Sequence, residues 1–247
     1  MNFISFKKHI VLVMLAVIST MLYVLDYFIL GSARDIASSF LGNLAFLPIY
    51  VIFVTLIIEQ SMRERERQTI MRKLNMVIGV FFSEVGNRLL KELSAYVVMC
   101  DDLRSKLLVS GQWNENDFQR ALDYLKSHEP LIDCGGCDIQ QLKKFLISKR
   151  TFLVGLLENQ NLLEHEQFTD LLWAVFHLVE ELDTRQSFDS MPISDIDHIN
   201  GDIKRAFGYL SREWVFYMKH LKHDYPYLFS LAVRLNPMLE HPDPLVY

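Results

Sequence analysis

Residues 9–30 read HIVLVMLAVISTMLYVLDYFIL, and residues 40–58 read FLGNLAFLPIYVIFVTLII. Apart from His9 at the edge, the only acidic or basic side chain inside these two apolar stretches is that of Asp26. At about 1.5 Å of rise per residue, each stretch is long enough as a helix to cross the hydrocarbon core of a bilayer. The segment between them, GSARDIASS at 31–39, is expected to form a short polar turn. The sequence therefore predicts a two-helix transmembrane hairpin within residues 1–60.

Basic residues flank this hairpin on its two outer ends. Lys7 and Lys8 precede the first span, and a basic juxtamembrane collar follows the second, made of Arg63, Arg65, Arg67, Arg72 and Lys73. Positive charge marks the cytoplasmic side of membrane spans, so we expect both termini in the cytoplasm and a multi-pass protein of the inner (plasma) membrane. The collar also favours contact with anionic lipid headgroups, which makes membrane lipids an expected partner.

Two polar side chains interrupt the spans at similar depth. In an antiparallel hairpin, Asp26 and Asn43 come near each other, where a hydrogen bond between them would hold the two helices together. The alternative is that Asp26 lines an ion path formed by several copies of the hairpin. We adopt the first interpretation.

Residues 61–247 carry helical patterns throughout and no alternating segment of strand length. The predicted helices cover 76–99, 115–128, 139–158 and 162–184, then a long helix after the loop at 186–195, and a short last helix for which Asp224 and Pro226 provide the start. Proline residues in the tail, 238–247, favour an extended conformation. The expected fold class is all-α: the hairpin followed by a cytoplasmic bundle of about six helices, in a domain 61–247.

The clearest amphipathic patterns lie in the last two long helices. Seven apolar residues of 162–184 fall within a 120° arc at 100° per residue: Phe168, Leu171, Leu172, Val175, Leu178, Val179 and Leu182. The following helix shows one apolar stripe: Ile199, Ile203, Ala206, Phe207, Leu210, Trp214, Tyr217 and Leu221. Both stripes are expected to face the core.

Polar residues on these same helices offer metal ligands. His177 and Glu181 lie one turn apart, as do His198 and Asp202, and two such helices facing each other would form a carboxylate–histidine site. The ordinary interpretation is that polar helix faces meet water. Cys134 and Cys137 form a CxxC that lacks both the βαβ setting of a redox motif and a complete zinc ligand set, so a glycine-rich turn is its simpler interpretation.

Composition excludes some functions. The chain of 247 residues has a net charge of −5, which argues against a general nucleic-acid binder. Three cysteines exclude a disulfide-built secreted scaffold. No catalytic motif occurs, so we predict no catalytic residues, no cofactor and no enzymatic activity.

Three segments carry a resemblance to known proteins: GNLAFLPIYVIFVTLIIEQ, NLLEHEQFTDLLWAVFHLVEEL and HLKHDYPYLFSLAVRLNP. They resemble a set of bacterial and archaeal two-span membrane proteins with no assigned function. The resemblance implies the same architecture over nearly the whole chain and no activity.

The leading functional hypothesis is therefore an inner-membrane protein whose cytoplasmic helical bundle binds a protein partner or transmits a signal, as a homo-oligomer. One alternative is a small oligomeric two-span ion channel with a cytoplasmic gating domain. The other is a membrane-tethered metalloprotein that uses His177, Glu181, His198 and Asp202.

Overall fold

The computed structural model is all-α over the part of the chain that it describes. These residues are 14, 17–22, 24–25, 27–28, 33–98, 100–134, 138–159, 162, 165–188 and 191–246. The elements are α2 (Ala33–Phe81), the π-helix η1 (Phe82–Gly86), α3 (Asn87–Ser94), α4 (Cys100–Leu107), α5 (Glu115–Ser127), α6 (Ile139–Leu157), α7 (Glu166–Thr184), α8 (Ile193–Asp224) and α9 (Pro226–Arg234). Among them there is no strand, only an isolated bridge between Val97 and Ile132.

Contacts divide the chain into two compact units, residues 1–67 and 68–247. The boundary falls inside α2, a few residues beyond the 60/61 division expected from the sequence.

The first unit contains the apolar part of α2. One helix within the described residues is long and apolar enough to cross a membrane, and its most apolar window has a mean hydropathy of 2.3 with none of it buried. The predicted span 40–58 lies within this helix, which also passes through Pro48. The predicted span 9–30 falls partly on residues outside the described set, Asp26 among them.

The polar segment between the expected spans differs from its prediction. Residues 33–39 are helical, since α2 begins at Ala33. Alanine and arginine favour a helix, and Gly31 is the last strong helix breaker before Gly42, so the helix extends further toward the N-terminus than the polarity of the segment indicated.

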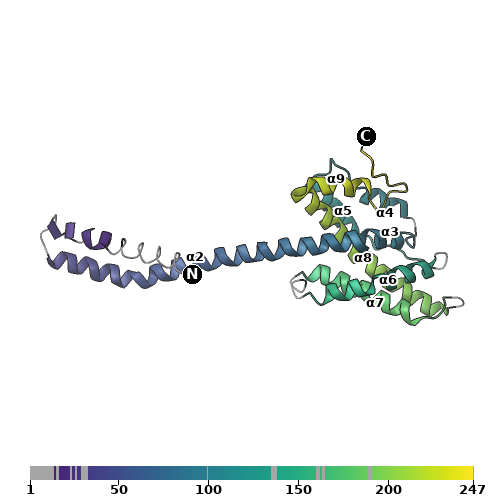
Figure 1. Ribbon diagram of the computed structural model, residues 1–247, viewed down its shortest axis with the longest axis horizontal. Helices are drawn as coiled ribbons and strands as arrows, with labels where there is room; N and C mark the ends of the chain where they lie inside the picture. Colours follow the sequence, from purple (N-terminus) through teal and green to yellow (C-terminus); the bar gives the residue numbers. More distant parts are fainter. Residues whose placement is uncertain are drawn as a thin grey trace. The chain divides into compact units, whose positions relative to one another are not determined.

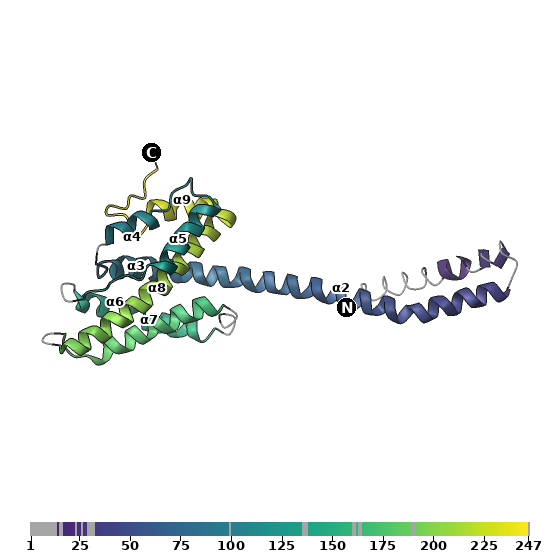
Figure 2. The same ribbon diagram turned by 180° about the vertical axis from the view of Figure 1, so that it is seen from behind.

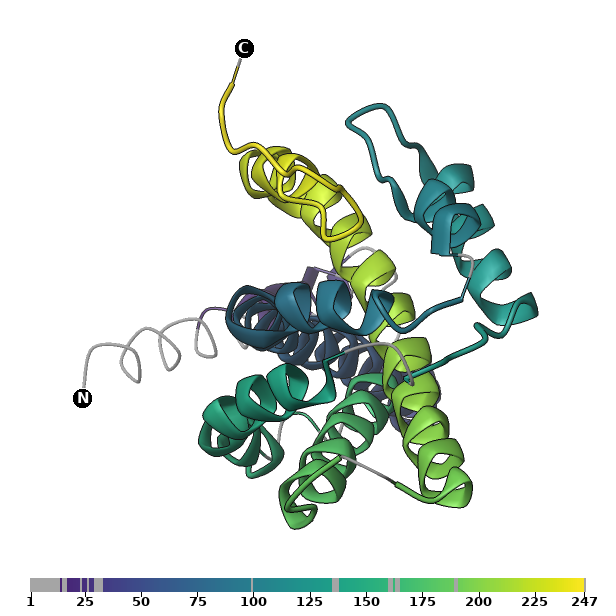
Figure 3. The same cartoon turned by 90° about the vertical axis from the view of Figure 1, so that its right-hand side faces the viewer.

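In the second unit, α8 is the helix against which most of the others pack. It contacts α7, α5, α9, α3 and η1, and α6 packs on α7. Figure 1 shows α6 and α7 on one side of α8, with α4, α5 and α9 on the other. The same arrangement appears from behind in Figure 2 and along the domain in Figure 3. A central helix of this kind is surrounded by neighbours, which requires an apolar stripe along most of its length.

The predicted core stripes are confirmed. All seven apolar residues of the 120° arc on α7 are buried, and so are the stripe residues of α8 except Tyr217, which is partly buried. Trp214 fills the centre and donates its indole N–H to Asn87 Oδ1 at 3.2 Å. Phe82 and Tyr217 stack with their rings 4.7 Å apart, so η1 packs directly on α8.

Several helix boundaries differ from the predictions. The expected helix 76–99 is three elements, because α2 ends at Phe81, η1 follows, and α3 ends at Ser94. The helix α4 was not predicted at all; two aspartates and two basic residues in eight positions hide its apolar contacts. The start of α6 agrees with the expected helix 139–158, and Asp138 caps it, since its carboxylate accepts the backbone N–H of Gln141 at 2.9 Å.

The ends of α7 and α9 also differ. The helix α7 begins at Glu166 and not at Leu162, because His165 caps it by accepting the backbone N–H of Phe168. Asp224 is the last residue of α8 instead of the cap of α9, which begins directly at Pro226. Proline suits that first position because its missing N–H would have no partner there.

Candidate metal centre

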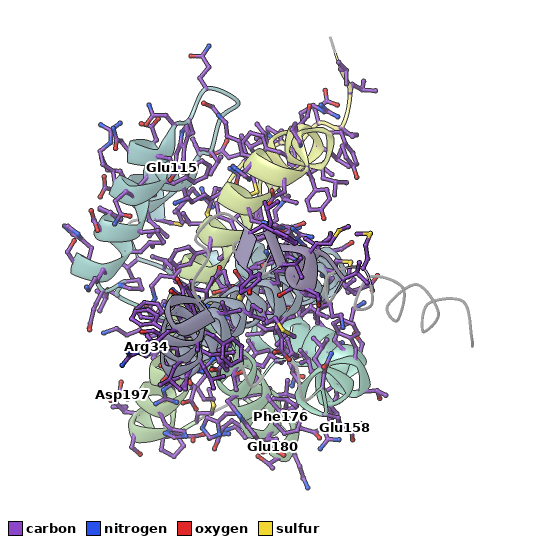
Figure 4. All side chains as sticks on the ribbon, turned by 90° about the vertical axis from the view of Figure 1, so that its left-hand side faces the viewer. Arg34, Glu115, Glu158, Phe176, Glu180 and Asp197 are labelled. Atoms are coloured by element: carbon purple, nitrogen blue, oxygen red, sulfur yellow. The ribbon has the colours of Figure 1, made fainter. Side chains whose placement is uncertain are left out.

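Two helices each present a histidine and a carboxylate one turn apart. His177 and Glu181 lie on α7, and His198 and Asp202 lie on α8. Residues four apart share one face of a helix, so each pair points the same way. The apolar stripes of α7 and α8 press the two helices together, which brings the pairs face to face. In Figure 4 the labels Phe176 and Glu180 mark α7, and Asp197 marks the start of α8.

The four side chains converge on one point. One nitrogen or oxygen atom from each lies within 4.8 Å of the others. His177 Nε2 is 3.5 Å and His198 Nε2 is 3.4 Å from Asp202 Oδ2. Glu181 Oε2 is 3.5 Å from His198 Nε2, and its Oε1 is 3.8 Å from His177 Nε2. Four ligands in a tetrahedron around a metal ion at 2.0–2.1 Å lie about 3.4 Å apart, so the two contacts of Asp202 match this value, while the widest separations, up to 4.8 Å, would have to contract on binding.

Asp202 is the deepest member of the group. Its side chain is 2% exposed, and its Oδ2 is a buried oxygen with no hydrogen-bond partner among the described residues. Burying a carboxylate oxygen without a partner is costly, so such an atom in a polar cluster calls for an explanation. A cation bound between Oδ2 and the two imidazoles would supply one.

An arginine binds each of the two carboxylates. Arg205 Nη1 donates to Asp202 Oδ1 at 2.8 Å, which leaves Oδ2 directed at the histidines. Arg185 Nη1 donates to Glu181 Oε2 at 2.7 Å, and the same guanidinium binds both oxygens of Asp195. Partners of this kind fix the orientation of metal ligands.

The electrostatics keep the glutamate ionised. The hydrogen bond from Arg185 holds the pKa of Glu181 below its usual value, against the smaller opposing effect of burial, and His198 adds to the lowering. A carboxylate must be ionised to bind a metal, so this favours binding. The side chains of His177 and His198 are 44% and 51% exposed, which leaves the site open to solvent.

Other residues singled out from the sequence are not brought into this group. Cys134 is buried, and its backbone N–H donates to Asn200 Oδ1 at 3.0 Å, while Cys137 lies outside the described residues. Among the residues that the structure describes, the group on α7 and α8 is the one with metal-ligand geometry. Asn43 and the basic collar, Arg63, Arg65, Arg67, Arg72 and Lys73, lie on exposed positions of α2.

The supporting arginines were not among the residues expected from the sequence. Arg185 follows Glu181 by four positions and Arg205 follows Asp202 by three, a spacing at which opposite charges pair on a helix and which could have indicated them. The burial of Asp202 was not expected, because it lies at the edge of the apolar stripe, between Ile199 and Ala206 on one side and His198 and Arg205 on the other.

Comparison with known proteins covers both units. The family described as "Uncharacterized protein MJ1433, C-terminal helical domain" matches residues 70–234, which include all of α7 and α8. The one described as "MJ1433, N-terminal helical domain" matches residues 3–62. The chain is 42% identical over 233 residues to the uncharacterized protein MJ1433 of Methanocaldococcus jannaschii, with 94% of each chain covered. No solved structure matches. The chain therefore belongs to the MJ1433 family of proteins with helical N- and C-terminal domains.

Proposed function

We propose that this chain is a membrane-anchored protein whose helical domain binds a divalent transition-metal ion between α7 and α8. The observation that carries the proposal is the unpartnered Oδ2 of buried Asp202, which faces the Nε2 atoms of His177 and His198. A bound metal ion would provide that oxygen with a partner, which the described residues of the protein do not provide.

The ligand set selects the class of metal. Two imidazole nitrogens and two carboxylate oxygens suit Zn²⁺, Fe²⁺, Co²⁺ or Mn²⁺, whereas Ca²⁺ and Mg²⁺ prefer oxygen ligands alone. Separations of 3.4–3.8 Å between contacting ligand atoms fit a compact four-ligand site.

The competing explanation is a network of ion pairs in which protonated histidines neutralise the carboxylates. In that case an imidazole N–H would hydrogen-bond Asp202 Oδ2. Neither does, although both Nε2 atoms lie within 3.5 Å of it. Both contacts are nevertheless within ion-pair distance, so metal titration distinguishes a shared metal ion from a shared proton.

The position of the site between two helices favours a role in sensing the metal ion. Ligands from two helices mean that a bound ion would join α7 to α8 and stabilise their packing. Half-exposed histidines allow the ion to enter and leave. We therefore infer a metal-responsive domain that transmits its state to a protein partner, and we retain homo-oligomerisation as part of the proposal.

The membrane part of the proposal is a two-span hairpin with both termini in the cytoplasm. Its support is the exposed apolar window of α2 with mean hydropathy 2.3, the apolar sequence of residues 9–30, and the basic residues at both outer flanks. The hairpin serves as the anchor of the helical domain.

Metal titration of the full-length protein in detergent tests the function. The protein is purified without a polyhistidine tag, stripped with a chelator, and titrated with Co²⁺ by visible absorption and with Zn²⁺ by calorimetry. We expect one ion per chain, and a rise in melting temperature with Zn²⁺ that chelator reverses. Asp202→Asn and His198→Gln should weaken binding at least tenfold, since each removes one ligand of four.

His223→Gln is the matched control, because His223 is an exposed histidine on the same helix that pairs with Asp224 outside the group. Its affinity should equal that of the unaltered protein. His177→Gln provides a second ligand variant at a half-exposed position, where we expect folding to be preserved. Binding of less than one ion per chain, or equal affinity in Asp202→Asn, would overturn the proposal.

A further inference from the structure

A cavity in the helical domain lies between α5 and α8, and Arg205, which binds Asp202 of the metal centre, contributes to its lining. It has a volume of about 330 Å³, at the lower end of the range for small-molecule pockets. The end of α5 and the loop after it form one wall, and the middle of α8 forms the other.

The lining of this cavity is strongly basic. Lys126, Lys204, Arg205 and Arg212 line it, with Glu129 as the acidic residue of the lining. The whole chain is acidic, with a net charge of −5, so this concentration of positive charge runs against its composition. Clefts lined by one sign of charge attract ligands of the other.

Two of the cations have a carboxylate partner and two do not. Lys204 Nζ lies 2.5 Å from Glu129 Oε2, and Arg205 binds Asp202. Within the described part of the chain, Lys126 and Arg212 pair with no carboxylate. They are the charges available to a ligand.

The cavity wall is held in place by specific contacts. Arg212 Nε donates to the backbone oxygen of Gly208 at 2.9 Å, and its guanidinium lies 5.1 Å from the centre of the Tyr209 ring. Arg205 is held by its bond to Asp202. At Gly201 and Gly208 there is open space where a side chain would project, so the helix surface between the cations stays accessible. Fixed guanidinium groups lose little conformational entropy on binding an anion.

We propose that this cavity binds a small phosphate-bearing anion. A phosphate carries up to two charges and several acceptor oxygens, which matches several cationic donors around one small volume better than a single carboxylate does. The phosphate group belongs either to a soluble phosphorylated molecule or to a lipid headgroup. The inference rests on Lys126 and Arg212, which take no part in the metal centre, although Arg205 touches both sites.

The test uses the full-length, chelator-treated protein in phosphatidylcholine nanodiscs at about 0.15 M salt. Inorganic phosphate and pyrophosphate are titrated by calorimetry. We expect saturable binding of one anion per chain, with pyrophosphate binding more tightly than phosphate. Arg212→Gln and Lys126→Gln should each weaken the binding of pyrophosphate at least tenfold.

Lys219→Gln is the matched control, since it removes one positive charge from the same helix at a residue that pairs with Glu115 away from the cavity. It should bind within twofold of the unaltered protein. Repeating the titration in nanodiscs that contain phosphatidic acid separates the sources: unchanged binding indicates a soluble ligand, and competition indicates a lipid headgroup. Absence of saturable binding to either anion, or equal loss in Lys219→Gln, would overturn the proposal.

Discussion

Two carboxyl groups are buried on α8, and they are stabilised differently. Asp202 has the guanidinium of Arg205 at 2.8 Å, whereas burial raises the pKa of Glu213 to about 7. A carboxyl whose folded pKa exceeds its unfolded value binds a proton more tightly in the folded state. The contribution of Glu213 to the stability of the folded state is therefore fully present below the unfolded pKa of about 4.5, and it is lost as pH rises through the folded pKa of about 7.

Glu213→Gln tests this difference. Glutamine has the same shape and no charge, so we expect the variant to be more stable than the unaltered protein at pH 8, by about 2–3 kcal/mol. At about pH 3, where the glutamate is protonated in both the folded and the unfolded state, the difference should be small. Chemical unfolding of the full-length protein in detergent at the two pH values measures it, and a gain of the same size at both would contradict the prediction.

At the scale of elements, η1 is the unusual feature of the fold. π-Helices are rare and occur mostly as single-turn insertions within α-helices. Here one connects α2 to α3, and Phe82 within it stacks on Tyr217 of α8. The insertion thus turns Phe82 toward the helix that carries half of the candidate metal centre.

Gly86, the last residue of η1, allows this close packing. A Cβ atom there would lie 2.5 Å from Phe82 Cδ1 and 2.9 Å from Phe81 Cε1, and both rings are fully buried. We expect Gly86→Ala to destabilise the protein by about 1–3 kcal/mol, because the rings have no room to move. Gly155→Ala in α6, where nothing lies within 4 Å, should instead be neutral or stabilising by up to about 1 kcal/mol. The melting temperatures of the two variants test this prediction. Equal changes in melting temperature for Gly86→Ala and Gly155→Ala would exclude a steric cause.

The start of α5 depends on a reciprocal cap. Asn114 Oδ1 accepts the backbone N–H groups of Asn116 and Asp117, and Asp117 Oδ2 accepts the backbone N–H of Asn114 at 2.7 Å. These bonds satisfy N–H groups that have no partner within the helix.

Asn114→Ala should cost about 1 kcal/mol of stability, measured as a shift in the unfolding midpoint. Asn114→Asp keeps an accepting oxygen at the same place and should recover most of the loss. An alanine variant as stable as the unaltered protein would show that the cap contributes nothing.

At the scale of the whole molecule, the two units differ in what covers their apolar side chains. The helical domain buries its apolar residues in one core, while the apolar window of α2 has no buried residue. Large apolar surfaces without a protein partner indicate an interaction site, and a lipid bilayer matches one of this length.

We expect the full-length protein to remain in the membrane pellet after washing with alkaline carbonate and with 1 M salt, and to be released by detergent. Substituting Arg63, Arg65 and Arg67 with glutamine should leave the retention in the membrane pellet unchanged, because burial of apolar side chains in the bilayer, and not the collar, would hold the protein there. Release by salt alone would instead indicate electrostatic attachment at the surface.

Part of the candidate site could be predicted from the sequence. The spacing of His177 with Glu181 and of His198 with Asp202 identified two faces able to bind a metal, but nothing local showed that those faces meet. No comparable pattern in the sequence marks the residues of the phosphate cavity, because Lys126 lies on α5 and Arg212 lies on α8. Residues far apart in the chain become neighbours only through packing, and single-sequence periodicity carries no information about it.

The all-α class, the buried stripes of α7 and α8 and the apolar character of residues 40–58 follow from the amino-acid sequence alone, because helix periodicity and hydropathy are local properties. The burial of Asp202, with an oxygen that has no hydrogen-bond partner among the described residues and with the neighbouring histidines still accessible, follows from the packing of the helices. At the edge of an apolar stripe, burial depends on how neighbouring helices cross it, and the crossing is set by the packing of ridges and grooves along both helices.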